Sequence, residues 1–416
     1  MDIITELKQR GVINNITNEE KAQKFLSNKD FSLYIGFDPS FRSLHLGNYL
    51  MLVTLKRFIQ HGYKPIALVG GATGQIGDPS GKKAERKILQ KDLIKENVEA
   101  IKKQFHDVLG DNVEVVNNAD FYEGMSIFDF FREIGKNINV NYLLEKEIIS
   151  KRLETGISYA EFSYNLIQGY DFQYLYQHKN VVLQMGGSDQ WGNITTGIEM
   201  IRKAVGDNNN AFGITFNLLT KSDGTKFGKS EGGAFYLDKT ITSPYTMYQF
   251  LLNQSDADVE KLLKYLTFYS IEEINQIIAE HNQNPSLRIA QKKLADAIVK
   301  DIHGEDELNK CHQISQMFFT NSLDQLSAQD LKMALSGVNN FDVIGSDSIS
   351  ILDALVGLKV VDSKSKARQL ITGKSIYVNN KLVEDINMNI TKSMAIDNEF
   401  VYLRKGKKNY FIINFK

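Results

Sequence analysis

A helical pattern lies between two strand patterns near the N-terminus and restricts the chain to few folds. Residues 31–38 read FSLYIGFD and residues 65–71 read PIALVGG, two mostly apolar runs of strand length. Between them, residues 46–61 (LGNYLMLVTLKRFIQH) have helical length and a broad apolar face. Strand, helix and strand in this order are typical of a parallel sheet. We therefore predict an α/β fold built on a Rossmann-like parallel sheet.

Further patterns extend this sheet unit and indicate additional domains on its C-terminal side. Residues 113–116 (VEVV) predict a third strand, and residues 181–193 (VVLQMGGSDQWGN) predict a buried strand that enters a glycine-rich loop and a helix. The pattern from 244 to 319 is mostly helical, and the C-terminal stretch reads as helices followed by short strands. We predict a Rossmann-like catalytic domain over 1–220, a helical domain with the KFGKS loop over 221–320, a linker over 321–348 and a small α+β domain over 349–416.

Composition restricts the chain to an ordinary globular protein. Of the 416 residues, 42% are hydrophobic and 24% are charged, which excludes a mostly disordered chain. The single cysteine, Cys311, excludes a disulfide framework and a cysteine-based zinc cluster. The first residues, MDIITELKQRG, lack the apolar core of a signal peptide, and no run of about 18 apolar residues predicts a membrane span. We expect a cytoplasmic protein that does not bind a membrane.

The net charge of -1 hides an uneven distribution along the chain. Residues 349–416 contain 12 Lys and Arg against 6 Asp and Glu, a net charge of +6, whereas the rest of the chain carries -7. A basic C-terminal segment on an acidic body favours contact with a polyanion. The alternative is a lysine-rich surface that is simply solvated.

The first candidate motif is YIGFDPSFRSLHLGN (34–48), in which a predicted strand leads to a loop and a helix. Open α/β sheets bind ligands at this edge. Gly36 lets the backbone approach a nucleotide, Asp38 can hold an amine or a hydroxyl, and the helix start at 45–48 favours phosphate. The alternative is a capped helix with a chance histidine.

Two further loops could bind an anionic ligand. GGATGQIGDPSGK (70–82) is rich in glycine and is followed by further cations, but it is one residue short of a Walker A motif and lacks GxGxxG. KFGKS (226–230) carries two lysines three residues apart, which can converge on a polyphosphate. Taken alone, KFGKS could also be an exposed basic turn.

Taken together, HLGN (45–48) and KFGKS resemble the HIGH and KMSKS signatures of class I aminoacyl-tRNA synthetases in order, spacing and setting. Nearly the whole chain resembles bacterial tyrosyl-tRNA synthetases. The matching segments are LYIGFDPS (33–40), ALVGGATGQIGDPSGKKAER (67–86), ETGISYAEFSYNLIQGYDF (154–172), QMGGSDQWGN (184–193) and DGTKFGKS (223–230). KARQLITGKSIYVNN (366–380) resembles an S4-type RNA-binding module, which agrees with the charge distribution.

The resemblance implies a tyrosine pocket. Tyr34 and Asp171 are expected to read the substrate phenol, and phenylalanine would leave both groups unpaired at about 1–3 kcal/mol each. Asp78, Tyr164 and Gln168 are expected to meet the substrate ammonium, and Gln190 either the tyrosine carboxylate or adenosine. The spacing of residues 164, 168 and 171 places them on one helix face. The alternative to substrate binding by this face is packing in the core.

The resemblance also implies ATP as substrate, with Mg²⁺ carried on its phosphates and no dedicated metal site. The expected ATP-binding residues are Gly36, Asp38, His45, Gly47, Asn48, Gly187, Asp189, Lys226, Lys229 and Ser230. The residues expected to assist catalysis by position and charge are Ser40, His45, Asn48, Lys82, Arg86, Lys226 and Lys229. Asn48 replaces the second histidine of HIGH, and Ile35 and Met51 cannot make polar contacts beside the ribose.

The expected partners are L-tyrosine, tRNA(Tyr) and a second copy of the chain. The RNA-binding candidates are Lys364, Lys366, Arg368, Lys374, Arg404, Lys405, Lys407 and Lys408. The resemblance implies a homodimer, for which residues 128–147 (FDFFREIGKNINVNYLLEKE) are the candidate interface.

Three other readings of the sequence predict different residues. A tryptophanyl-tRNA synthetase would lose the pair Tyr34 and Asp171, and a non-catalytic RNA-binding protein would lose the motifs or the pocket. A nucleotidylyltransferase shares an HxGH motif but would not need the basic C-terminal segment. The expected activity is therefore ligation of tyrosine to tRNA through a tyrosyl-adenylate.

Overall fold

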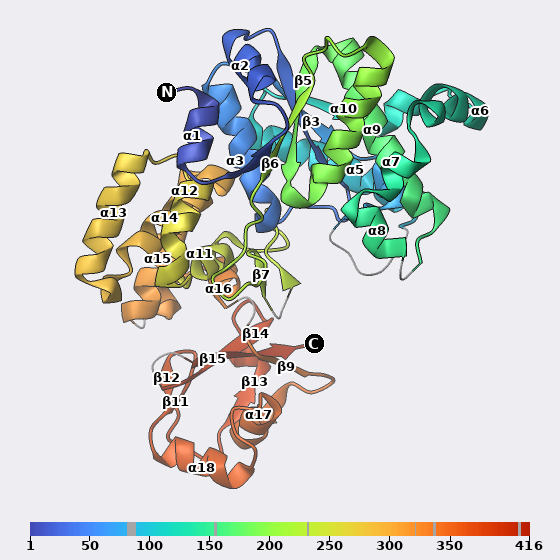
Figure 1. Ribbon diagram of the computed structural model, residues 1–416. Helices are drawn as coiled ribbons and strands as arrows, with labels where there is room; N and C mark the ends of the chain where they lie inside the picture. The colour runs from blue at the N-terminus through green and yellow to red at the C-terminus, as the bar shows by residue number, and fades with distance from the viewer. Residues whose placement is uncertain (81–88, 154–155, 231–232, 321, 336–337, 407–408) are drawn as a thin grey trace. The chain divides into compact units, whose positions relative to one another are not determined.

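The computed structural model describes residues 1–80, 89–153, 156–230, 233–320, 322–335, 338–406 and 409–416 (Figure 1). Packing separates the chain into two units. Unit 1 comprises Met1–Ile241 and Gln254–Ile298, and unit 2 comprises Thr242–Asn253 and Val299–Lys416. This division differs from the four expected segments, because residues 254–298 belong with the N-terminal sheet.

A six-stranded sheet forms the centre of unit 1. Its order is β1-β6-β5-β2-β3-β4; β2 to β6 run parallel, and β1 is antiparallel to β6. The strands are β1 (Ile13–Ile16), β2 (Ser32–Phe37), β3 (Pro65–Val69), β4 (Glu114–Asn117), β5 (Val181–Gly187) and β6 (Phe212–Phe216). This sheet confirms the predicted α/β class. The sequence did not predict β1, whose two central residues are exposed, or β6, which is short and contains Gly213.

The order of the strands fixes where a ligand can bind. From β2 the chain adds β3 and β4 on one side, and later β5 and β6 on the other side. Loops that leave β2 and β5 therefore diverge and open a crevice at the carboxyl ends of these strands. The loops after residues 37, 69 and 187 all start at this edge.

Unit 1 also contains helices. They are α1 (Ile3–Gln9), α2 (Glu19–Ser27), α3 (Leu46–Gln60), α4 (Thr73–Ile76), α5 (Lys91–Leu109), α6 (Ile127–Asp129), α7 (Val140–Leu144), α8 (Glu147–Leu153), α9 (Tyr159–Lys179), α10 (Trp191–Val205), α12 (Asp256–Leu266), α13 (Ile271–Gln283) and α14 (Ile289–His303), which continues into unit 2. Of these helices, α3, α5, α9 and α10 contact the sheet. The long helix α9 begins at Ser158, whose Oγ accepts a hydrogen bond from the Glu161 amide (3.2 Å), and ends at Asn180 in the left-handed region (φ 52°). Phe172 and Leu175 of α9 pack with Ile66 and Leu68 of the sheet in one buried cluster.

Helix α12 is fixed at both ends by polar contacts within unit 1. At its C-terminal end, the buried guanidinium of Arg57 in α3 donates to the carbonyl oxygens of Tyr265 (3.3 Å) and Thr267. Near its N-terminal end, the buried carboxylate of Asp258 accepts a hydrogen bond from the Ser222 amide (2.7 Å). The helix therefore joins α3 to the segment that precedes KFGKS.

Unit 2 contains helices and a second sheet. The helices are α11 (Pro244–Leu252), α15 (Glu305–Thr320), α16 (Ala328–Ala334), α17 (Ile351–Gly357) and α18 (Lys364–Thr372). The strands are β9 (Asn340–Val343), β10 (Ser348–Ser350), β11 (Ile376–Val378), β12 (Lys381–Leu382), β13 (Asn389–Thr391), β14 (Phe400–Lys405) and β15 (Asn409–Phe415). The main sheet has the order β12-β11-β14-β15-β9, with β9 parallel to β15.

The predicted linker over 321–348 is corrected by the structure. Helix α16 and strand β9 lie within this range, and Leu331 and Leu335 pack against Phe400 and Tyr402 in a buried cluster. These elements are stabilised by residues at the chain end, so the local polar pattern does not reveal them. Among the described residues, no helix is long and apolar enough to cross a membrane.

Candidate functional site

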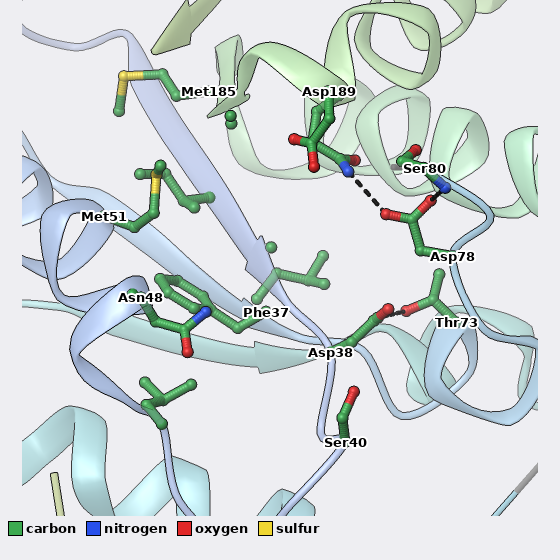
Figure 2. A pocket seen from close by; sticks show the side chains of 18 of the residues that line it. Phe37, Asp38, Ser40, Asn48, Met51, Thr73, Asp78, Ser80, Met185 and Asp189 are labelled. Carbon is green, nitrogen blue, oxygen red and sulfur yellow. Dashed lines mark hydrogen bonds between the residues drawn. The ribbon is translucent and has the colours of Figure 1, made fainter. Parts of the chain in front are cut away.

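A cavity of about 810 Å³ lies at the crevice predicted from the strand order. The loops after β2, β3 and β5 line it together with α3 and α9 (Figure 2). It brings together these predicted residues: Tyr34, Gly36, Asp38, Ser40, His45, Gly47, Asn48, Asp78, Tyr164, Gln168, Asp171, Gly187, Asp189, Gln190 and Lys226. Lys82 and Arg86 lie outside the described residues, and Lys229 and Ser230 form the short strand β7 (Lys229–Ser230), which pairs with β8 (Gly233–Ala234).

Two buried groups in this cavity can share one hydroxyl. Tyr34 and Asp171 are each 1% exposed, and the Tyr34 hydroxyl has no hydrogen-bond partner among the described residues. The Asp171 carboxylate accepts one hydrogen bond from the Asn118 amide (2.9 Å) and a longer one from the Tyr122 hydroxyl (3.4 Å). Burial raises the pKa of Asp171 well above its usual range, and burial followed by the Asp171 charge raises the pKa of Tyr34. Tyr34 therefore keeps its proton and can donate.

A second group of polar side chains surrounds Asp78. One carboxylate oxygen of Asp78 accepts from the Gln190 amide nitrogen (2.7 Å), and the other accepts from the Ser80 backbone amide (2.8 Å). Gln168 donates to the Gln190 carbonyl (3.2 Å), and Asn193 donates to the Gln168 carbonyl (2.8 Å). A carboxylate beside amide carbonyl oxygens is a suitable acceptor site for an ammonium group.

Asp38 connects the loop after β2 with α4 and α9. Its two carboxylate oxygens accept from the Thr73 hydroxyl (2.8 Å) and the Tyr164 hydroxyl (3.2 Å). Asn118 donates to Thr73 (3.2 Å) as well as to Asp171, so these polar groups form one connected network. Figure 2 shows Asp38 directed toward Thr73, with Met51 and Met185 in another part of the pocket.

Several residues of this network were not predicted from the sequence: Thr73, Ser80, Asn118, Tyr122 and Asn193. Three of them lie inside the motif segments, and Asn118 comes shortly after the predicted strand 113–116 at the ligand-binding edge. The strand-end position was a usable signal for Asn118. No local pattern distinguishes Tyr122 from a core tyrosine.

The HLGN and KFGKS segments lie against each other. The Leu46 amide donates to the Phe235 carbonyl (2.8 Å), and the Phe235 amide donates to the Gly228 carbonyl (3.0 Å). Gly228 has φ +80°, and a Cβ at this position would lie 2.8 Å from the Gly47 nitrogen. Asn48 accepts a hydrogen bond from the His45 amide (3.2 Å) and thereby caps α3. Main-chain contact thus brings two motifs from distant parts of the sequence to one end of the cavity.

The C-terminal candidates differ in exposure. Lys364, Lys366, Arg368 and Lys374 are exposed, and the three lysines pair with Asp353 (2.6 Å), Asp362 (2.7 Å) and Glu384 (3.6 Å). Lys405 donates to the Val360 carbonyl (3.4 Å), and Lys407 and Lys408 lie outside the described residues.

Arg404 does not fit the predicted role in RNA binding. Only 7% of the residue is exposed, and its guanidinium lies 3.8 Å from the centre of the Tyr377 ring. It also donates to the Gly406 carbonyl and to the Asn380 side chain (3.4 Å). Arg404 therefore packs the sheet of unit 2, and the prediction for this residue is corrected.

The chain matches two family models and several known proteins. Residues 26–320 match the class I tRNA synthetases (W and Y), and residues 330–413 match the tyrosine–tRNA ligase SYY-like C-terminal domain. The chain is 53% identical to a tyrosine–tRNA ligase of Ureaplasma urealyticum over 99% of this chain and 98% of the relative. It is 46% identical to tyrosine–tRNA ligase 1 of Bacillus subtilis over the full length of both. A C-terminally truncated mitochondrial tyrosyl-tRNA synthetase of Aspergillus nidulans aligns with a TM-score of 0.69 at 30% identity, covering 76% of this chain and 94% of that structure.

Proposed function

The chain belongs to the tyrosyl-tRNA synthetases of bacterial type, and from this premise we propose how its cavity accommodates the substrates. The protein is a tyrosine–tRNA ligase, which activates L-tyrosine with ATP and transfers the tyrosine to the 3′ end of tRNA(Tyr). Its individual residues divide into a phenol site, an ammonium site and an ATP site.

The buried pair Tyr34 and Asp171 reads the phenol of the substrate. The observation that carries this assignment is the buried Tyr34 hydroxyl, which has no partner among the described residues, in the same cavity as a buried carboxylate. A bound tyrosine hydroxyl would donate to Asp171 and accept from Tyr34. Phenylalanine would leave both groups desolvated and unpaired, at a cost of about 1–3 kcal/mol for each group.

The Asp78 group holds the other end of the amino acid. Asp78, Tyr164 and Gln168 line the cavity together and supply oxygen atoms for the substrate ammonium. Gln190, whose amide nitrogen is hydrogen-bonded to Asp78, would turn toward the tyrosine carboxylate. This arrangement fixes the carboxylate for attack on the α-phosphorus of ATP.

ATP occupies the part of the cavity between the ends of β2 and β5 and the two signature motifs. We assign Gly36, Asp38, Gly187 and Asp189 to adenosine, Ser40 and His45 to the γ-phosphate region, and Gly47 and Asn48 to ATP. Lys82, Arg86, Lys226, Lys229 and Ser230 would stabilise the departing pyrophosphate. Mg²⁺ prefers phosphate and water oxygens, and we propose that it accompanies ATP on its phosphates.

Binding of tRNA and dimerisation use other surfaces. The exposed Lys364, Lys366, Arg368 and Lys374 would contact tRNA phosphates. Ile127, Phe128, Phe131 and Val140 are exposed apolar residues within or next to the candidate interface 128–147, with exposures of 60%, 79%, 44% and 58%. We assign this apolar surface to an isologous homodimer. We propose that the enzyme works in the cytoplasm, where it would charge tRNA for translation.

The test is ATP–pyrophosphate exchange by the purified protein with each of the twenty amino acids. We expect exchange with tyrosine alone. The Tyr34→Phe variant should retain exchange with tyrosine at a higher KM and should discriminate less against phenylalanine. Unchanged discrimination in this variant would contradict the phenol assignment, and exchange with another amino acid would contradict the pocket as a whole.

A further inference from the structure

An aromatic pair lines the cavity, and none of the proposed contacts with tyrosine or ATP uses it. Phe41 and Tyr236 both line the cavity, with ring centroids 4.6 Å apart and ring planes inclined by 39°. Phe41 is 42% exposed although it is a large apolar side chain. Because Phe41 also lines the cavity, its exposed ring surface is available to a ligand that extends out of the cavity.

Hydrogen bonds from main-chain amides join the two segments that carry these rings. The Asp238 amide donates to the Ser43 hydroxyl (3.1 Å), and the Leu237 amide donates to the Leu44 carbonyl (2.8 Å). The segment that follows Phe41 is therefore fastened to the segment that follows Tyr236. Because this backbone is ordered before a ligand arrives, binding on the two rings costs little conformational entropy.

The next residue, Arg42, adds a positive charge to the pair. Arg42 is exposed and forms no ion pair with any residue in the part of the chain that the structure describes. Surfaces that bind single-stranded nucleic acid combine aromatic rings, on which bases stack, with cations that contact the backbone phosphates. Phe41 and Tyr236 supply rings in the cavity lining, and Arg42 supplies a cation next to Phe41 in the chain.

The second half-reaction requires a nucleotide at this place. Transfer of tyrosine needs a ribose hydroxyl of the 3′-terminal nucleotide of tRNA at the adenylate inside the cavity, so the attached base must lie in or beside the cavity. We propose that Phe41 and Tyr236 form a stacking platform for the 3′-terminal base of tRNA and that Arg42 contacts a neighbouring phosphate. The proposal depends on the charging activity but not on which residues bind tyrosine.

The experiment compares the two half-reactions in the full-length enzyme. Adenylate formation is followed by pyrophosphate exchange, and transfer is followed in a single turnover from enzyme-bound tyrosyl-adenylate to tRNA(Tyr). Loss of one base–aromatic stack should slow transfer in Phe41→Ala about tenfold more than adenylate formation. Phe41→Trp should restore transfer. Leu287→Ala is the matched control, because Leu287 is 51% exposed and lies outside the cavity lining.

A shortened tRNA identifies the base. Phe41→Ala should bind intact tRNA(Tyr) more weakly than the wild type does. The two enzymes should bind tRNA that lacks its terminal adenosine equally well. Arg42→Gln should reduce the salt dependence of tRNA binding by about one counterion.

Three results would overturn the proposal. Equal losses in both half-reactions would place Phe41 on the ATP side, and a Phe41→Trp enzyme as slow as Phe41→Ala would exclude stacking. If Phe41→Ala bound the shortened tRNA more weakly than the wild type does, Phe41 would not stack on the terminal base. If the proposed charging activity itself were wrong, the unmodified enzyme would show no transfer. This result differs from all three results above.

Discussion

At the scale of single residues, the tyrosine pocket holds a carboxylate under unfavourable conditions. Asp171 is fully buried, and burial is the main cause of its raised pKa, with the nearby Asp38 charge adding to it. The hydrogen bonds from Asn118 and Tyr122 act in the opposite direction. In the free protein, burial of the Asp171 charge therefore costs free energy. A hydrogen bond from the hydroxyl of bound tyrosine would reduce this cost.

Asp171→Asn should make the fold more stable and the enzyme inactive. Asparagine keeps the shape and can still accept from Asn118, but it removes a buried charge, so we expect a higher Tm at pH 7 and at least a hundredfold loss of tyrosine-dependent exchange. The measurement is thermal unfolding alongside pyrophosphate exchange. A lower Tm with normal exchange would contradict this account of the site.

The stability gained from Asp171→Asn should depend on pH. The native pKa of Asp171 is raised above the unfolded value of about 3.9, so the native state binds this proton more firmly than the unfolded state. The Asp171 carboxyl therefore does not lower the free energy of unfolding below about pH 4. The loss in this free energy grows as the pH rises through the native pKa. The difference in Tm between variant and wild type should be near zero at pH 4 and should widen toward pH 8. A constant difference would exclude the titration as its cause.

At the scale of elements, the glycine of KFGKS allows the two signature motifs to touch. Gly228 and Gly224 both have φ +80°, but only Gly228 is crowded, by the Gly47 nitrogen and Leu46. Gly228→Ala should therefore separate the segments and lower kcat for adenylate formation at least tenfold. Gly224→Ala is the matched control, since it bears the same backbone strain of about 1–2 kcal/mol in open space. Equal losses of kcat in the two variants would show that backbone strain alone causes the effect.

Helix α12 depends on the buried Arg57. Arg57→Ala leaves the carbonyl oxygens of Tyr265 and Thr267 without this donor, so we expect a loss of about 2–4 kcal/mol in the free energy of unfolding. Urea denaturation measures it. Arg202→Ala removes an arginine with a 42% exposed side chain and should change the value by less than about 0.5 kcal/mol. A similar effect in both variants would contradict the role of Arg57 in fixing the helix.

Elements with strong local patterns were predictable, and those held by distant partners were not. Strand β2 and helix α3 can be recognised from a buried apolar run and a helical apolar face. Strand β9 depends on pairing with β15 at the far end of the chain, and no window around Asn340–Val343 contains that information. The candidate site followed the same rule. Motif residues from the HLGN segment and Lys226 of KFGKS line one cavity, whereas the buried position of Arg404 arises from its packing on Tyr377.

At the scale of the whole molecule, the contacts of unit 2 decide where the chain can be shortened. A chain of residues 1–348 would keep α16 and β9 but lose β14 and β15, leaving Leu331 and Leu335 without their buried partners. We expect it to aggregate. A chain of residues 1–320 should stay soluble, form tyrosyl-adenylate and charge tRNA poorly, as measured by size-exclusion chromatography, pyrophosphate exchange and aminoacylation. Normal charging by the shorter chain would contradict the RNA-binding role of the C-terminal segment.

The hydrogen bonds between residues 44–46 and 235–237 set the earliest moment at which a growing chain can become active. A ribosome that adds about 5–20 residues per second needs about 10–40 s to proceed from the first segment to the second. During this interval His45 and its neighbours are already synthesised, but their partner segment does not yet exist. A chain interrupted before residue 235 therefore carries an intact first signature motif and lacks the segment that completes the phosphate end of the cavity.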